Sequence, residues 1–141
     1  MKRVLVAAAL LSTTISTTAF GQSVSELPAK LSGRWTATTP TGIFVDVFSV
    51  TFEGNRAAGT VPGRLTWRGV NCGAKDEPIQ AQWDGTELKF EAVLKADTNT
   101  QRSYGKCGTE PVRWILKLKG DQTFEGEGRV GNIVVTVTAA P

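Results

Sequence analysis

Histidine is absent from the 141 residues, and methionine, tyrosine and cysteine are scarce, with one, one and two copies. Without an imidazole, neither a Ser-His-Asp nor a Cys-His catalytic arrangement can be built. Two sulfurs fall short of the ligand sets of structural zinc sites, and no glycine-rich phosphate loop is present. The sequence therefore predicts a protein that is not an enzyme and that carries no metal or cofactor.

Long apolar runs are also nearly absent, and the longest one, Val4 to Leu11, covers only eight residues. A membrane span needs roughly 20 such residues. The run follows Lys2 and Arg3 and is followed by small residues up to Gly21, which is the order of a secretory signal peptide. We therefore expect residues 1–21 to be removed, residues 22–32 to lead into the domain, and the mature protein to be periplasmic or secreted without a membrane span.

Charge of one sign does not dominate the chain. Without Lys2 and Arg3 the 16 basic residues fall to 14, against 13 acidic ones, so the net charge of the mature chain is +1. Nucleic-acid binding needs basic residues gathered on one face. The basic residues here are scattered among acids, which argues against a nucleic-acid partner.

Helix signals are nearly absent after the leader, whereas the alternation of apolar and polar residues typical of strands is frequent. Turn residues such as Asp84-Gly85 divide this pattern into short segments. We predict eight strands, at 34–39, 43–52, 57–68, 78–83, 87–95, 112–119, 122–129 and 132–138. One apolar face for each strand favours an all-β, eight-stranded antiparallel up-and-down barrel over residues 33–139, with a two-sheet sandwich as the alternative.

The two cysteines, Cys72 and Cys107, fall in the two longest predicted loops, at about 69–77 and 96–111. In an up-and-down barrel these loops share one end, and the tight turns share the other. In an oxidising compartment we expect one disulfide between the cysteines, which closes a loop of about 35 residues and contributes roughly 3–4 kcal/mol. The end with the long loops is then the expected mouth of the barrel.

Three tryptophans, Trp67, Trp83 and Trp114, share the parity of the apolar positions of their strands. Such rings either fill a core or line a small-ligand pocket. Polar side chains of the expected mouth are the further candidates for ligand binding: Arg68, Asn71, Asp76, Arg102, Tyr104, Lys106 and Glu110. We expect an exported, non-catalytic protein that binds a small molecule there. The alternative is a protein–protein module, an inhibitor of a secreted enzyme or an envelope component, that uses the long loops.

The predicted second strand is apolar on both faces near its start. Ile43, Val45 and Val47 alternate with Phe44, Asp46 and Phe48. One face of such a strand covers the core, and the other is suited to a partner subunit. The pattern raises the possibility of a homodimer.

The segment Leu31-Ser32-Gly33-Arg34-Trp35 resembles the start of calycin barrels, the lipocalin and avidin superfamily. In those folds the tryptophan packs at the barrel floor, which is the role expected for Trp35. The strand count and the absence of a terminal helix are most similar to the small bacterial avidins. Some of these link the same two loops by a disulfide.

The biotin-site pattern of the avidins is largely missing. Ala37 stands where the family has an asparagine, Trp67 lies near the place of a tyrosine, and Phe90 is the sole aromatic residue of the fifth predicted strand. Asn132 and Ile133 replace an aspartate that begins the last strand, and only Trp114 matches a ring-stacking tryptophan. The resemblance therefore implies a barrel with a cavity, and not a biotin site.

Overall fold

The computed structural model describes residues 26–68, 72–93, 95–96, 111–120, 122–130 and 133–141. The predicted signal peptide and part of the lead-in lie outside these residues. Among the described residues, no helix is long and apolar enough to cross a membrane.

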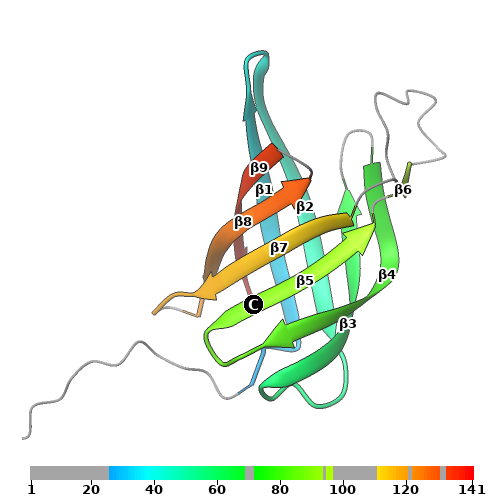
Figure 1. Cartoon of the computed structure of the whole chain (residues 1–141), viewed down its shortest axis with the longest axis vertical. Helices are drawn as coiled ribbons and strands as arrows, with labels where there is room; N and C mark the ends of the chain where they lie inside the picture. The colour runs from blue at the N-terminus through cyan, green and yellow to red at the C-terminus, as the bar shows by residue number, and fades with distance from the viewer. Residues whose placement is uncertain (1–25, 69–71, 94, 97–110, 121, 131–132) are drawn as a thin grey trace, which may run out of the picture.

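Within the described residues, all helix-or-strand structure consists of β-strands that form one closed, antiparallel barrel (Figure 1). Apart from the short β6, each strand pairs with the strands before and after it, and the last strand pairs with the first. The strands are β1 (Lys30–Thr39), β2 (Gly42–Phe52), β3 (Gly59–Arg68), β4 (Cys72–Trp83), β5 (Glu87–Val93), β6 (Lys95–Ala96), β7 (Pro111–Leu118), β8 (Phe124–Val130) and β9 (Ile133–Ala140). The two-residue β6 follows β5 closely in the chain and pairs with β4, so the barrel has eight strand positions. The predicted barrel is confirmed, and the sandwich alternative is excluded.

Strand β4 begins at Cys72, six residues earlier than predicted. The missed part contains Asp76, whose φ of 53° interrupts the alternation, and the register with β3 shifts between Leu65 and Trp67. The bulge is held by Arg64, whose Nη1 donates to the carbonyl oxygen of Asp76 at 3.2 Å, and by Thr66, whose hydroxyl accepts from the Asp76 N–H at 3.3 Å. Residues 72–77 contain a glycine and several polar residues, which are typical of a loop. The sequence pattern therefore did not indicate a strand there.

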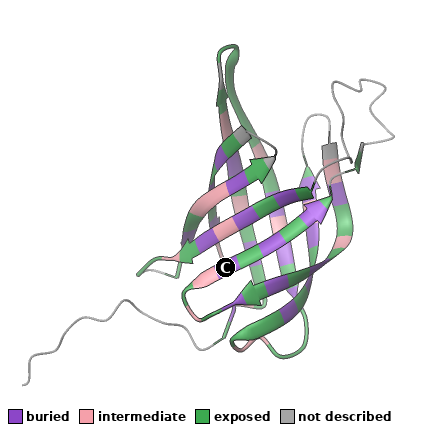
Figure 2. Ribbon diagram, viewed as in Figure 1, coloured by how far each residue is buried: buried purple, intermediate pink, exposed green. Residues whose placement is uncertain are grey.

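The barrel interior is apolar, and buried and exposed residues alternate along the strands (Figure 2). No polar or charged residue of the described part is buried. Large rings fit because glycines face them: a Cβ on Gly128 would overlap the ring of Trp35, and a Cβ on Gly33 would lie 2.5 Å from Cζ of Phe48. Shape matching between glycine and aromatic residues therefore fixes the positions of these rings.

The end of the barrel with the tight turns is ordered by local hydrogen bonds. Oδ1 of Asp84 accepts from the N–H groups of Thr86 and Glu87 at 2.8 and 2.7 Å and from the Thr86 hydroxyl at 2.9 Å. These bonds to the charged form lower the pKa of Asp84. Gly85, with φ of 98°, supplies the left-handed turn position. The predicted turn at Asp84-Gly85 is therefore present.

The mouth predicted from the sequence belongs to the opposite end of the barrel, where β3 ends at Arg68, β4 begins at Cys72 and β7 begins at Pro111. Cys72 pairs with Ala96 through the β4–β6 ladder, so the chain enters the 97–110 segment beside the start of β4. Cys107 lies outside the described residues, as does the side chain of Cys72. The disulfide between them remains a prediction.

Candidate functional site

Four aromatic side chains pack together inside the barrel. Trp35 lies 4.5 Å from Trp67 and 5.6 Å from Trp114, measured between ring centroids. Trp67 meets Trp114 edge to face at 5.5 Å, and Phe90 stacks on Trp114 at 4.8 Å with an interplanar angle of 15°. Strands β1, β3, β5 and β7 thus each contribute one ring to this aromatic cluster. Offset and edge contacts of this kind stabilise a core beyond the area that they bury.

Trp83 does not belong to the aromatic cluster. It packs against Phe124 at 5.9 Å, at the end of the barrel that carries the tight turns. The structure therefore brings two of the three candidate tryptophans together and keeps the third apart.

The position of Trp35 differs from the one expected at the barrel floor. Strand β1 begins at Lys30, four residues before the predicted start, so Trp35 is its sixth residue and not its second. Leu31 occupies the buried position nearer the start of the strand. Trp35 consequently lies within the aromatic cluster, two inward-facing positions beyond Leu31 along β1. The lead-in residues Lys30 and Leu31 were missed because the alternation before Gly33 is too short to indicate a strand.

The indole N–H groups of Trp67, Trp83 and Trp114 are buried without a hydrogen-bond partner among the described residues. A buried donor without an acceptor costs about 1–3 kcal/mol. Two of these three donors, those of Trp67 and Trp114, belong to the aromatic cluster. The aromatic cluster is thus mostly apolar, but it contains two indole N–H groups that are free to donate hydrogen bonds.

Asp46 is an acidic residue next to the aromatic cluster. It is half-buried on β2 and is the cross-strand partner of Trp35. Burial raises the pKa of Asp46, and a weaker interaction with the Trp67 side chain opposes that increase. The Trp67 Nε1 nevertheless has no hydrogen-bond partner of acceptable distance and angle among the described residues, so this donor is unsatisfied.

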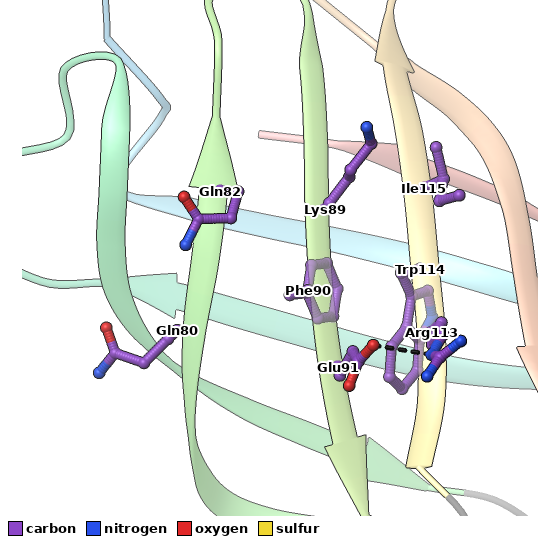
Figure 3. A pocket seen from close by; sticks show the side chains of 8 residues that line it. All are labelled: Gln80, Gln82, Lys89, Phe90, Glu91, Arg113, Trp114 and Ile115. Carbon is purple, nitrogen blue, oxygen red and sulfur yellow. Dashed lines mark ion pairs between the residues drawn. The ribbon is translucent and has the colours of Figure 1, made fainter.

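The ladder between β4 and β5 is interrupted beside the aromatic cluster. Strands β4 and β5 pair only at Gln82 with Lys89 and at Trp83 with Leu88. Beyond these two pairs the ladder ends, and among the described residues β4 next pairs on this side with β6, at Gly73 and Cys72. An open pocket of about 510 Å³ lies at this interruption (Figure 3). We call it the wall pocket.

Polar side chains form the rim of the wall pocket, and the aromatic cluster lies beneath it. The lining residues are Gln80, Gln82, Lys89, Phe90, Glu91, Arg113, Trp114 and Ile115. Figure 3 shows the two glutamines on β4, across from the ion pair between Glu91 and Arg113. Phe90 and Trp114 are buried members of the lining, so the pocket ends on the edge of the cluster.

The charges on the rim are compensated within the protein. Arg113 Nε lies 2.7 Å from Glu91 Oε1, and Lys89 Nζ lies 2.6 Å from Glu87 Oε1. The Gln82 amide exchanges hydrogen bonds with the Thr60 hydroxyl at 3.1 and 3.2 Å. The Gln80 amide has no partner in the part of the chain that the structure describes. It leaves two N–H donors and one acceptor oxygen available at the rim.

The candidates at the predicted mouth are only partly described. Arg68 is exposed at the end of β3, and Asp76 lies in the β4 bulge, where its carboxylate is 3.6 Å from Arg64 Nη1. The other mouth candidates lie outside the described residues: Asn71, Arg102, Tyr104, Lys106 and Glu110. Sequence analysis missed the rim of the wall pocket, because Gln80, Gln82, Glu91 and Arg113 follow the ordinary polar alternation of exposed strand faces.

The described residues contain no cluster of three or more groups that could hold a metal ion. Their acidic side chains are engaged mainly in surface ion pairs, as with Glu127 and Arg129 at 2.8 Å. No family model, curated protein or solved structure matches this chain. The closed barrel is compatible with a calycin-like fold, and the case for a function depends on the geometry above.

Proposed function

We propose that this protein is an exported, non-catalytic binding protein that holds a small polar ligand in the wall pocket. The observation that carries the proposal is the pocket of about 510 Å³ at the interruption between β4 and β5, with a polar rim and an aromatic base. Its size falls in the range of small-molecule sites, which also combine aromatic surface with a few polar groups. The proposed site is the wall pocket, whereas the sequence predicted a site at the barrel mouth, most of whose candidate residues lie outside the described part of the chain.

The rim favours a neutral ligand with several hydroxyl or amide groups. Both cations of the rim already have carboxylate partners, so an anion gains little net charge attraction there. Gln80 offers a free amide, and the Arg113 guanidinium keeps donors beyond the Nε that faces Glu91. A sugar-like molecule matches this set, because each of its hydroxyl groups both donates and accepts.

The unsatisfied indole of Trp114 supports the same proposal. An acceptor group on the ligand that reaches this N–H would remove a penalty of about 1–3 kcal/mol. Such an approach requires local opening of the wall beside Phe90, where the β4–β5 ladder is already interrupted. Binding is therefore expected to reduce the mobility of β5 and to change tryptophan fluorescence.

Export, the Cys72–Cys107 disulfide and a relationship to the avidin-like calycins belong to the proposal as well. The apolar run before Gly21 supports export. The pairing of Cys72 with Ala96, the last described residue before the part of the chain that contains Cys107, supports the disulfide. The eight-stranded closed barrel supports the calycin relationship.

Native mass spectrometry of protein recovered from its own cells is the first test. An added mass that disappears on denaturation supports a bound small molecule and identifies it by mass. A protein that carries no added mass, and that binds no neutral disaccharide from a panel read by tryptophan fluorescence, would contradict the proposal. The protein–protein alternative would then be tested by pull-down of secreted proteins.

Variants of the rim locate the site. Gln80→Ala and Arg113→Gln each remove hydrogen bonds to the ligand and should weaken binding about five- to tenfold. Arg129→Gln is the matched control, since Arg129 forms a similar ion pair, at 2.8 Å, on the outer face of β8. Equal weakening by Arg129→Gln and Arg113→Gln would show that the ligand does not bind at the wall pocket.

A further inference from the structure

The hairpin of β1 and β2 extends beyond the barrel as a two-stranded arm (Figure 1). Strand β1 pairs with β9 only over residues 32–36, and β2 pairs with β3 only over residues 47–52. In the described part of the chain, residues 37–39 and 42–46 therefore form strand pairs only across the β1–β2 hairpin itself. We call residues 37–46 the hairpin arm.

Strand β2 gives the hairpin arm exposed apolar side chains on both of its faces. Ile43, Phe44 and Val45 are consecutive, so their side chains point to alternate faces, and they are 69%, 46% and 53% exposed. No charged residue occurs between Thr36 and Val45. An isolated two-stranded ribbon has little stability of its own in water, and here it also exposes three large apolar side chains.

Two arginines stand at the base of the arm. Arg34 and Arg68 are the cross-strand partners of Val47 on its two sides, so all three residues lie in one row on the outer surface. Both arginines are exposed. Of the arginines in the described part of the chain, Arg56, Arg64, Arg113 and Arg129 each have a carboxylate partner, whereas these two have none.

We propose that the hairpin arm docks the protein on an anionic phospholipid surface. The apolar side chains of Ile43, Phe44 and Val45, next to the uncharged turn of residues 39–42, enter the boundary between headgroups and acyl chains, and Arg34 and Arg68 bind headgroup phosphates. Arginine is suited to phosphate because its planar guanidinium donates two parallel hydrogen bonds. Apolar insertion combined with basic residues at the interface is the usual basis of peripheral membrane binding.

The dimensions of the arm fit this arrangement. Ile43 lies four residues beyond the row of Val47, which is about 13 Å along a strand. Interfacial segments bury their apolar side chains about 5–10 Å deep. The long arginine side chains can bridge the remaining distance to the phosphates. Asp46, the acidic residue within the arm, has the parity of buried Phe48 and faces the barrel side, away from the outer row.

A second copy of the chain fits the hairpin arm less well than a lipid surface does. A stable protein interface takes roughly 20–30 residues from each side, and the arm offers four or five on each face. A rigid partner placed on one face also leaves the other face in water, so that either Phe44 or the pair Ile43 and Val45 remains uncovered. A fluid apolar medium covers both faces at once.

Vesicle flotation tests the proposal. Protein is recovered from cells that express the full chain, and its N-terminus is established by intact mass. It is mixed with vesicles of phosphatidylcholine, with or without an equal part of phosphatidylglycerol. We expect flotation with the anionic vesicles, at least tenfold weaker flotation with phosphatidylcholine alone, and strong weakening in 0.5 M salt. Failure to float with anionic vesicles would overturn the proposal.

Variants separate the two parts of the contact. Ile43→Ser with Phe44→Ser should weaken flotation at least tenfold, whereas Val93→Ser, which changes an exposed valine on β5, should not. Arg34→Gln with Arg68→Gln should weaken binding roughly 20-fold on anionic vesicles only, since each basic residue at the surface contributes about fivefold. Arg129→Gln is the charge-matched control.

The rival occupant gives a different result. Sedimentation velocity that shows a dimer, together with its dissociation by Ile43→Ser and no vesicle binding, would assign the arm to self-association and refute lipid docking. Circular dichroism of every variant establishes that the barrel has folded. The arm is distinct from the wall pocket, so the outcome is independent of the proposed ligand.

Discussion

Replacing Trp114 by phenylalanine tests whether the buried indole donors are truly without acceptors. Trp114 is 1% exposed, stacks on Phe90 and has no partner for its Nε1. Phenylalanine keeps an aromatic ring in the cluster and removes the N–H. In an ordinary core the substitution only leaves a small cavity, whereas here it also removes an unsatisfied polar group.

The two effects have opposite signs. The cavity lowers the free energy of unfolding by about 1 kcal/mol. Loss of a buried donor without an acceptor raises it by about 1–3 kcal/mol. The expected net change for Trp114→Phe lies between zero and a stabilisation of about 2 kcal/mol. Trp35→Phe is the control, because Trp35 belongs to the same cluster and its Nε1 is not among the buried donors without a partner. This control should destabilise by about 1 kcal/mol.

Urea denaturation followed by circular dichroism at neutral pH measures both changes in the free energy of unfolding. Equal slopes of this free energy against urea concentration show that the variants expose similar surface areas on unfolding. The reasoning is refuted if Trp114→Phe destabilises the barrel as much as Trp35→Phe does. That result would mean that the Trp114 N–H has an acceptor in solution. The unsatisfied indole would then no longer support a ligand in the wall pocket.

Three further predictions concern pH and packing. The lowered pKa of Asp84 means that its stabilising bonds are present above about pH 4 and are lost as the pH falls through its folded pKa, so Asp84→Ala should lower the urea midpoint at pH 7 but progressively less below pH 4. The raised pKa of Asp46 has the reverse sign: its charged form weakens the fold above that pKa, so Asp46→Asn should raise the midpoint at pH 7 and have no effect at pH 3. Gly128→Ala forces a Cβ into the ring of Trp35 and should lower the free energy of unfolding by about 1–3 kcal/mol, whereas Gly120→Ala, which meets open space, should change the thermal midpoint little.

The barrel could be predicted from the sequence because each strand has one dry face. In β7, for example, Val112, Trp114 and Leu116 are buried, as the alternation indicates. Turn residues then separated the strands at nearly the observed places. The early start of β4 could not be predicted, since its bulge is stabilised by Arg64 and Thr66 of another strand.

The candidate site was predicted less well, for a related reason. The alternation placed Trp67 and Trp114 inside, but only the barrel register determines that they meet each other while Trp83 lies elsewhere. The wall pocket depends on where the β4–β5 ladder ends, which leaves no local mark in the sequence. The hairpin arm did leave such a mark, because β2 is apolar on both faces near its start.

The pairing of β1 with β9 joins the first and last strands of the domain. Residues about 100 positions apart must therefore meet before the barrel closes, and non-local pairing of this kind makes folding slow. A chain that is being synthesised can form its internal hairpins, but it cannot complete the fold until its last segment has been made. Late closure of this sort keeps the polypeptide unfolded until its last strand has been made, which is the state that the proposed export would require.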